Sequence, residues 1–525
     1  MNKKQFFPLE YLVAVAALVL LVPVGAFAQE GEYRYADATQ LWRLTDNAAG
    51  FGLDASADRG YAEFEFEHRE GDYRRVQEGG QRNQLTFTTE RYQKISMLLV
   101  GYGRFQFDMD RTKDRAWCDV MRPYNANPYF SGSSIAGKYD SQNFDLTAAV
   151  STIPIPMASD HADRELLLGA RLDYKVGDLS RLRDPRSRSE LLDYKVTPSV
   201  AFVFGHHTVG LNGHYDRRKE KIPNMTTEQT DPNMKYYTMT GLEQANGLVG
   251  GYGGYSREWV NHEFGAELNY GYRQGALNSL TSVAVSRGVE DVWGQYKYEP
   301  GKFTSYRYAL SSHNRITTDK TLHQLDLTIN MTDAFADEYR QQLIQERDAE
   351  HGYTSYRYET QIEFSKRYQV KTRQGTFHYR CSWLDGAAET GYAGMSFAAQ
   401  DVKNSRLLHR SDLHYNRFDL QAEGAKAFFG RRLWVDLSAT YHFSDEASLR
   451  LADASTDYAQ GVLIPDMAYY RANYWQGRAE VKYLFPLAIK QTSVTCYVKA
   501  YGDYLRTNND RDASTVGLAV GMIQF

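Results

Sequence analysis

Residues 433–443 read LWVDLSATYHF, and this stretch decides the fold. Apolar and aromatic side chains occupy every odd position, whereas tryptophan, aspartate, serine, threonine and histidine occupy the even ones. Because successive side chains of a β-strand point to opposite faces, this alternation indicates a strand with one apolar and one polar face. We therefore place Val435 and Leu437 on the apolar face and Asp436 and Ser438 on the polar face.

The same period of two returns in four other long stretches, at residues 166–175, 260–270, 324–331 and 478–485. Such runs approach the ~9–11 residues that a tilted strand needs to cross a bilayer, and exceed the ~5–6 residues usual in soluble sheets. Their polar faces carry full charges, which a dry sandwich core could not bury unpaired. Lipid outside and water inside satisfy both faces. The sequence therefore predicts an all-β chain folded as a transmembrane antiparallel β-barrel.

Composition agrees with this fold and excludes several others. The 525 residues include 40 Tyr, 25 Phe and 7 Trp, and aromatic rings near strand ends form the girdles of membrane barrels. A mean hydropathy of −0.57 excludes a polytopic helical membrane protein, and the aromatic content excludes a disordered chain. A net charge of −4 gives no basic field for nucleic acid.

The N-terminus carries an export signal. Lys3 and Lys4 precede an apolar run at 12–24, and Ala26-Phe27-Ala28 supplies a small-residue cleavage site. The run is short for a ~20-residue membrane anchor, so we expect residues 1–28 to be a cleaved signal peptide and the cell outer membrane to be the destination. Residues 29–59 then form an N-terminal hatch or a periplasmic lead-in, and residues 60–525 form the barrel.

Counting alternating runs gives about 20 strands, with a range of 16–20, and single-chain bacterial barrels have an even number. The expected strands include 83–91, 248–257, 289–298, 354–366 and 374–384. Residues 333–347 look helical, because Phe335, Tyr339 and Leu343 recur every four positions.

Connections between strands fall into two classes. Three tight turns are predicted to be periplasmic: 205–206, 300–301 and 430–431. Three long polar connections are predicted to be extracellular: 110–140, 219–247 and 445–469.

The segment before the first strand contains Trp42, Thr45, Asn47 and Gly50. Its Asn47-Ala48-Ala49 stretch resembles the N-terminal hatch of the long-chain fatty-acid transporter type of barrel, with Ala48 in place of the proline of that family. The resemblance implies a hatch inside the lumen; a loose periplasmic lead-in is the alternative.

A wider resemblance rests on three motifs: the Trp42-x-x-Thr45-x-Asn47-x-x-Gly50 opening, Gly101-Tyr102-Gly103-x-Phe105 and Asp184-Pro185-Arg186. The chain resembles an uncharacterised outer-membrane β-barrel family of Bacteroidota, a domain of unknown function. Its ending, Ile523-Gln524-Phe525, is similar to the signature by which such barrels reach their assembly machinery. The resemblance implies a fold, a location, and outer-membrane lipid and the barrel-assembly machinery as partners, but no activity.

Signals for chemistry are sparse. His442-Phe443-Ser444 has the His-x-Ser spacing of outer-membrane phospholipase A, but Asp445-Glu446 follows where that enzyme has Asn-Gly. Asp108, Asp110 and Asp114 could be rim carboxylates of an omptin-like protease, yet acidic loops are common on barrels. We expect no enzyme, no cofactor and no metal site. Cys381 and Cys496 are expected to face lipid, Cys118 to lie in an extracellular loop, and none to form a disulfide.

The charges expected in the lumen are of both signs: Glu63, Glu65, Arg171, Lys175, Glu263, Glu267, Arg478, Glu480 and Lys482. A pore selective for one sign of ion would show one sign dominating. We therefore expect a porin-like transport or channel component for a small solute. The alternative is a non-enzymatic scaffold that binds surface lipoproteins in a larger uptake complex.

Overall fold

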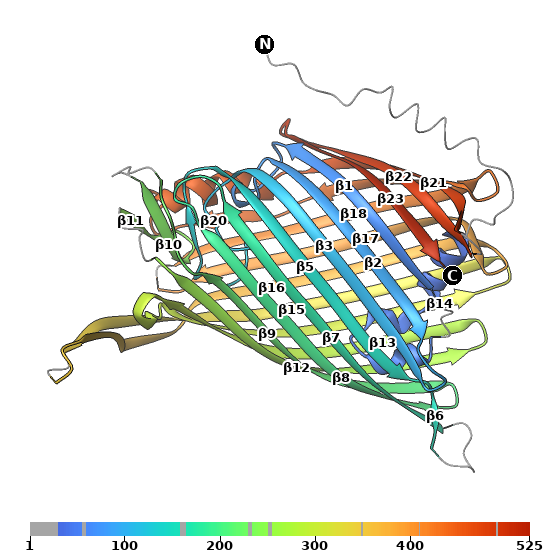
Figure 1. Ribbon diagram of the computed structural model, residues 1–525. Coiled ribbons are helices and arrows are strands. Elements are labelled where there is room, and N and C mark those ends of the chain that lie inside the picture. The colour runs from blue at the N-terminus through green and yellow to red at the C-terminus, as the bar shows by residue number, and fades with distance from the viewer. Residues whose placement is uncertain are drawn as a thin grey trace.

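The computed structural model describes residues 30–54, 59–157, 164–228, 234–249, 255–347, 350–408, 410–489 and 492–524. The predicted signal peptide and the terminal Phe525 lie outside these ranges. Figure 1 shows slanted strands that surround the short blue helices of the N-terminus. The wall strands are β1 (Arg59–Gly71), β2 (Gln81–Lys94), β3 (Leu99–Arg115), β5 (Gly137–Thr152), β7 (Arg164–Arg181), β8 (Arg188–Phe204), β9 (His207–Ile222), β12 (Arg257–Gln274), β13 (Leu277–Gly294), β14 (Gly301–Thr317), β15 (Thr321–Arg347), β16 (Thr354–Asp385), β17 (Ala388–Arg406), β18 (Ser411–Phe428), β19 (Leu433–Phe443), β21 (Tyr474–Ile489), β22 (Thr492–Thr507) and β23 (Asp512–Gln524).

These strands close into an antiparallel barrel of 18, with the short β6 (Ile155–Pro156) and β20 (Ala447–Arg450) added at its edges. The ring is closed by β1 and β23, which pair from Gly60 opposite Gln524 to Gly71 opposite Ala513. We call the end of the barrel at Gly60 and Gln524 the terminal rim, and the opposite end the loop rim. The predicted membrane-type barrel fold is confirmed, and 18 lies within the predicted range.

Two differences account for the two strands that the prediction counted in excess. Of the expected strand at 248–257, residues 250–254 lie outside the described residues, and the range adds no strand of its own to the described wall. Residues 248–249 end β11 (Gln244–Val249), which forms a separate sheet with β10 (Lys235–Gly241) and β4 (Ser131–Ser133). The expected strands 354–366 and 374–384 are one strand, β16. The strand expected at 289–298 is the second half of β13, which begins at Leu277.

Two further predictions were wrong. Residues 333–347 are not helical but continue β15, because β14 and β16 both offer hydrogen-bonding edges along it. Pro300-Gly301 is a connection at the loop rim rather than the terminal rim, since it joins β13 to β14 where β12 begins. The turns at 205–206 and 430–431 do lie at the terminal rim, and the three long connections lie at the loop rim.

The wall follows the predicted parity. Leu437 is 57% exposed and Phe264 is 63% exposed on the outside of the barrel. Asp436 points inward, where Arg34 of the N-terminal segment donates to its carboxylate. An apolar outer surface and a polar inner one are what a wall between lipid and water requires.

The long connections fold back into the mouth of the barrel instead of standing above it. They contribute the β4–β10–β11 sheet, η3 (Val76–Glu78), the π-helical η5 (Ala459–Leu463) and α3 (Ile464–Tyr470). No helix in the described part of the chain is long and apolar enough to cross a membrane. A buried apolar cluster joins these loops to the inner wall, and it includes Trp117, Tyr129, Tyr237, Met239, Trp259, Tyr368, Tyr415, Val462 and Met467.

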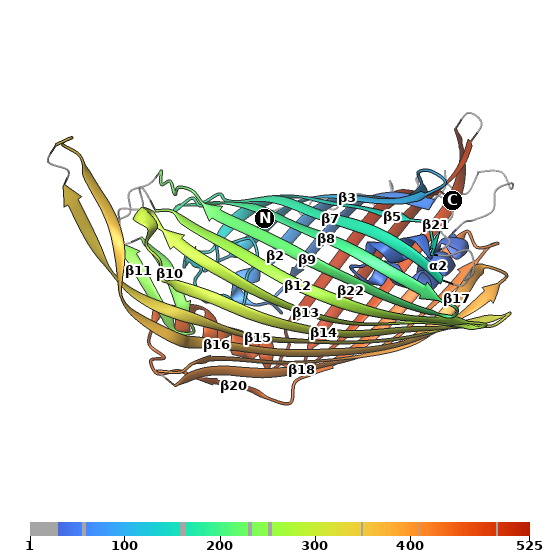
Figure 2. The same cartoon turned by 90° about the horizontal axis from the view of Figure 1, so that it is seen from below.

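One hairpin leaves the barrel. The pairing of β14 with β15 ends at Glu338, and that of β17 with β16 begins at Tyr368, yet β15 and β16 stay paired out to Arg347 and Thr354. Figure 2 shows this two-stranded arm rising from the loop rim beside the short η4 (Gln295–Lys297) connection.

Candidate functional site: the N-terminal segment and the mouth cavity

Residues 30–54, which we call the N-terminal segment, lie inside the barrel near the terminal rim (Figure 2). They form α2 (Glu30–Thr39), η1 (Leu41–Leu44) and η2 (Ala48–Gly52). Ionic contacts hold α2 to the wall. Arg34 donates to both oxygens of Asp436 at 2.9 and 3.2 Å, and Lys482 Nζ lies 2.6 Å from Glu30 Oε2.

The four residues that the sequence singled out in this segment come together in η1 and η2. Asn47 Oδ1 accepts from the Ala49 amide at 3.1 Å and caps η2, and Thr45 Oγ1 accepts from the Asn47 amide at 3.2 Å. Trp42 is buried, and a Cβ on Gly50 would lie 2.0 Å from its ring. The Trp42 ring therefore packs directly on the Gly50 backbone, and only glycine fits there.

Small and polar side chains of the barrel wall contact η2. Asn47 Nδ2 donates to Asn269 Oδ1 at 2.9 Å, and Ser199 Oγ accepts from the Ala49 amide at 3.0 Å. Ser151 Oγ donates to the Ala49 carbonyl at 2.8 Å. Gly169 allows this approach, because a Cβ there would lie 2.3 Å from the Ala49 nitrogen. These contacts are hydrogen bonds that water could replace.

The predicted lumen charges line the inner wall in separate ion pairs and do not converge on one site. Lys499 Nζ lies 3.0 Å from Glu63 and 2.8 Å from Glu65, and Lys175 lies 2.7 Å from Asp145. Arg171 pairs with Asp173 at 2.8 Å and lies 3.8 Å from Asp46 of the N-terminal segment. The remaining contacts join Glu263 to Arg307, Glu267 to Asn269, Arg478 to Glu480 and Lys482 to Glu30.

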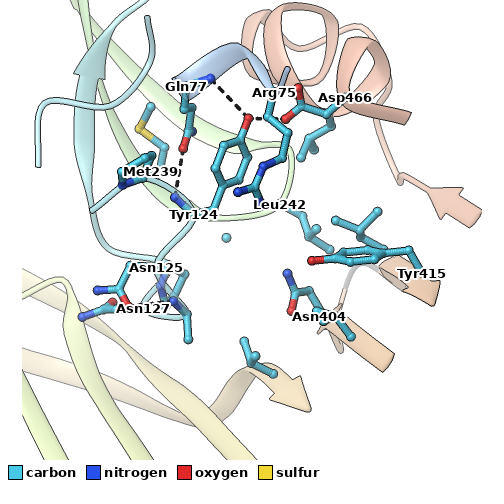
Figure 3. Close-up of a pocket in the computed structure, with 18 of the residues that line it drawn as sticks. Arg75, Gln77, Tyr124, Asn125, Asn127, Met239, Leu242, Asn404, Tyr415 and Asp466 are labelled. Atoms are coloured by element: carbon cyan, nitrogen blue, oxygen red, sulfur yellow. Dashed lines mark hydrogen bonds between the residues drawn. The ribbon is translucent and has the colours of Figure 1, made fainter. Parts of the chain in front are cut away.

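A cavity of about 330 Å³, which we call the mouth cavity, lies between the folded-in loops and the inner faces of β16, β17 and β18 (Figure 3). This volume is at the lower end of the range for small-molecule sites. Tyrosine rings and side-chain amides make up much of its lining. They include Tyr124, Tyr368, Tyr415, Tyr458, Tyr470, Asn125, Asn127, Gln400 and Asn404.

Hydrogen bonds fix one side of the mouth cavity. The Tyr124 hydroxyl donates to Asp466 and accepts from the Gln77 amide at 3.2 Å. The Arg75 guanidinium lies 3.9 Å from the centre of the Tyr124 ring and pairs with Glu78. Burial raises the pKa of Asp466 to about 6, although the Tyr124 hydroxyl and the Val76 amide both donate to its carboxylate.

The opposite side holds an acceptor without a partner. The side-chain Oδ1 of Asn404, on β17, is buried and accepts no hydrogen bond from the described residues. A buried unpaired amide oxygen costs about 1–3 kcal/mol, which a donor group on a bound solute would recover. The cavity therefore suits a small polar solute with an apolar face. Its residues come from distant loops and strands, and no single motif in the sequence marks them.

The residues weighed for enzyme chemistry are engaged elsewhere. His442 is 1% exposed, bonds to Asp419 Oδ1 at 2.7 Å and stacks on Tyr474. Ser444 Oγ donates to the Glu446 carbonyl at 3.3 Å. Asp108 faces the lumen and accepts from Gln84 and Thr86. Among the residues that the structure describes, no group of three His, Cys, Asp or Glu side chains is placed to hold a metal ion.

A protein-family model matches residues 48–524, almost the whole wall and the end of the N-terminal segment, and it describes a family of unknown function, DUF6850. The chain belongs to this family. A search of curated proteins finds no match.

Solved structures give distant likenesses. The chain is similar to the FrpB iron transporter of Neisseria meningitidis (9% identity, TM-score 0.37, 89% of this chain and 81% of that one). It is also similar to the ferric yersiniabactin uptake receptor FyuA of Yersinia pestis (9%, TM-score 0.39, 90% and 80%) and the siderophore receptor PiuA of Acinetobacter baumannii (8%, TM-score 0.39, 89% and 82%). At these scores the likenesses carry no argument about the function of this member of DUF6850.

Proposed function

We propose that this DUF6850 barrel is an outer-membrane transport component for a small polar solute, with the N-terminal segment as a displaceable hatch. One observation carries the proposal. The lumen holds a solute-sized cavity behind the loop rim, while the segment that fills the terminal rim is attached by ion pairs, hydrogen bonds and two small apolar clusters around Trp42 and Ala49. The ring of strands closes through the pairing of β1 with β2 and β23, to which the described residues 30–54 add no strand, so the segment can move without unfolding the wall.

The proposed location rests on the wall itself and on the sequence. The outer face carries exposed apolar side chains such as Phe264 and Leu437. The predicted signal peptide 1–28 would export the chain, and the assembly machinery would insert it into outer-membrane lipid. A source in Bacteroidota, kinship of the hatch with fatty-acid transporters, and the lack of enzymatic activity stay predictions.

The experiment is a conductance measurement in planar lipid bilayers with the mature chain. Removal of residues 30–54 should convert a nearly closed barrel into an open one with a large steady conductance. Gly50→Ala should give intermittent openings, because its Cβ would displace the Trp42 ring. Gly103→Ala is the matched control, since a Cβ there meets nothing within 4 Å. An unchanged conductance after the deletion would contradict the proposal.

The alternative function, a scaffold for surface partners, is favoured by the arm of β15 and β16. Beyond Tyr339 and Arg367 neither of its outer edges pairs with another strand of the described chain, and unpaired strand edges are templates for adding a strand. A chain with residues 341–365 replaced by a two-residue turn should keep its barrel. If that variant loses a co-purifying surface protein while the deletion of 30–54 opens no conductance, the scaffold is the correct function.

A further inference from the structure

A second cavity, of about 350 Å³, lies on the other side of the folded-in loops from the mouth cavity. It is enclosed by the connection 72–80, residues 121–123 and the loop-rim ends of the inner wall from β1 to β8. Its lining is strongly basic, and we call it the arginine cavity. Six cations line it, Arg69, Arg74, Arg82, Arg115, Arg122 and Lys175, against three carboxylates, Glu70, Glu78 and Asp110.

The carboxylates do not balance these cations. Glu78 pairs with Arg75, which lies outside this cavity, at 2.5 Å. Asp110 lies 3.6 Å from Arg82, and Glu70 lies 3.5 Å from His68. Lys175 is paired with Asp145.

Four arginines remain: Arg69, Arg74, Arg115 and Arg122. Within the ranges that the structure describes, none of the four makes a salt bridge. Arg74 Nη1 reaches only the Asp114 carbonyl, at 3.5 Å, and the buried Arg115 is held by the carbonyls of Cys118 and Val120. These four arginines line one cavity, whereas Lys499, Arg171 and Lys482 of the inner wall are each paired with a carboxylate. Six cations face three carboxylates in this lining, and Asp193 adds a further negative charge near Arg122, so positive charge is in excess and a bound anion would relieve the repulsion that remains.

The arginine cavity borders two other hollows of the loop rim. Pro123 lines both it and the mouth cavity, so one loop separates the two. Arg74 lines both it and an outer cavity of about 700 Å³, whose lining includes Asp72 and Arg511. Arg74 therefore lies between these two cavities.

We propose that the arginine cavity binds the anionic group of a small solute, a carboxylate, sulfate or phosphate, on its way through the loop rim. The planar guanidinium matches the oxygens of such groups in paired hydrogen bonds, and Arg69 and Arg122 are exposed to the cavity and available to make them. This inference names the substrate class of the proposed transporter and so rests on the proposed function, but binding can be measured without transport.

The test uses the purified full-length mature chain in detergent and calorimetric titration with three probes of similar size: glucose, gluconate and glucose 6-phosphate. The two anions should bind at least about tenfold more tightly than glucose, and binding should weaken as salt is raised from 50 to 500 mM. Arg69→Gln and Arg122→Gln should each weaken anion binding by about tenfold. Neither arginine side chain makes a hydrogen bond or salt bridge to another described residue, and retained heat-modifiability on gels checks the barrel.

Arg183→Gln is the matched control, because Arg183 is an exposed arginine of the same rim that lies outside the arginine cavity. It should leave the affinity unchanged. Equal binding of glucose and both anions, or equal loss in all three variants, would overturn the inference. Gluconate binding alone or glucose 6-phosphate binding alone would assign the anion as carboxylate or phosphate. Anion binding without solute uptake into proteoliposomes would contradict the proposed function and leave the anion site standing.

Discussion

The Arg34 guanidinium donates to both carboxylate oxygens of Asp436 and lies 4.3 Å from the centre of the Trp434 ring. The two side chains of the ion pair stand 402 residues apart in the chain. Their contact joins α2 of the N-terminal segment to β19 of the wall, and both side chains are largely buried from water. Paired hydrogen bonds between ionised groups are among the strongest polar contacts in proteins.

Breaking this contact should loosen the N-terminal segment. We expect Arg34→Gln and Asp436→Asn each to lower the urea concentration at which the conductance of the intact chain rises. A double-mutant cycle should give a coupling of roughly 1.5–3 kcal/mol, the usual range for hydrogen bonds to charged groups. Asp385→Asn, which alters a rim carboxylate 3.7 Å from Arg431, is the control and should have no effect. Additive effects of the two variants would show that the pair does not hold the hatch.

The two faces of β19 can be distinguished by one pair of substitutions. Leu437 is on the lipid side, so Leu437→Arg should cost roughly 2–4 kcal/mol of folding free energy at the bilayer midplane. Ser438 lies on the lumen side between Glu423 of β18 and Arg478 of β21, where an added charge stays in water, so Ser438→Arg should be mild. The folded fraction in lipid vesicles, measured by heat-modifiability on gels, should separate the two. Equal damage from both would indicate a dry core on each face.

The alternation of apolar and polar residues in the sequence was enough to predict the wall, because a strand between lipid and water must place them on opposite faces along its whole length. The prediction failed where this alternation is interrupted. In β16 the register against β15 shifts between Ala336 and Glu338, and Lys366 has a φ of 52°. A second shift, between Arg340 and Gln341, inserts one residue and exchanges the faces of β16. These irregularities interrupt the alternation, and β16 was therefore predicted as two strands. The helical spacing of Phe335, Tyr339 and Leu343 was overruled by the same pairing.

The N-terminal motif was predictable because its contacts are local: Trp42 packs on Gly50 and Asn47 caps the turn that follows it. The two cavities at the loop rim were not predictable in this way. Arg69 and Arg122 come from different connections and meet only because the loops fold into the mouth. Period-two patterns carry no information about how loops pack, and single arginines in loops look like ordinary solvated charges.

The three cysteines should differ in reactivity. All three are free thiols, as expected, although Cys118 is 1% exposed within the folded-in loops rather than on an open loop. Burial raises the pKa of the Cys118 thiol to about 11, which suppresses the reactive thiolate at neutral pH. In lipid vesicles a charged maleimide should label none of the three, while an apolar maleimide should reach Cys381 and Cys496. In denaturant all three should react, and the recovery of only one thiol would contradict this.

Asp466 should make the folded-in loops sensitive to pH. Burial raises its pKa to about 6 from an ordinary value of 3.8, so the closed loop holds the proton more tightly than an opened loop does. The sign follows from linkage: the closed form is favoured at acidic pH, and this stabilisation is lost as pH rises from about 4 to about 6. A shift of this size is worth at most about 3 kcal/mol.

Hydrogen exchange of amides 459–470, corrected for intrinsic rates, should therefore show roughly tenfold or more opening at pH 7 than at pH 4.5. Asp466→Asn, which stays neutral, should abolish this difference, whereas Asp445→Asn, on the exposed part of the same connection, should keep it. If Asp466→Asn retains the full difference in opening, another group closes the mouth, and the buried carboxyl beside Tyr124 serves only to hold the cavity in shape.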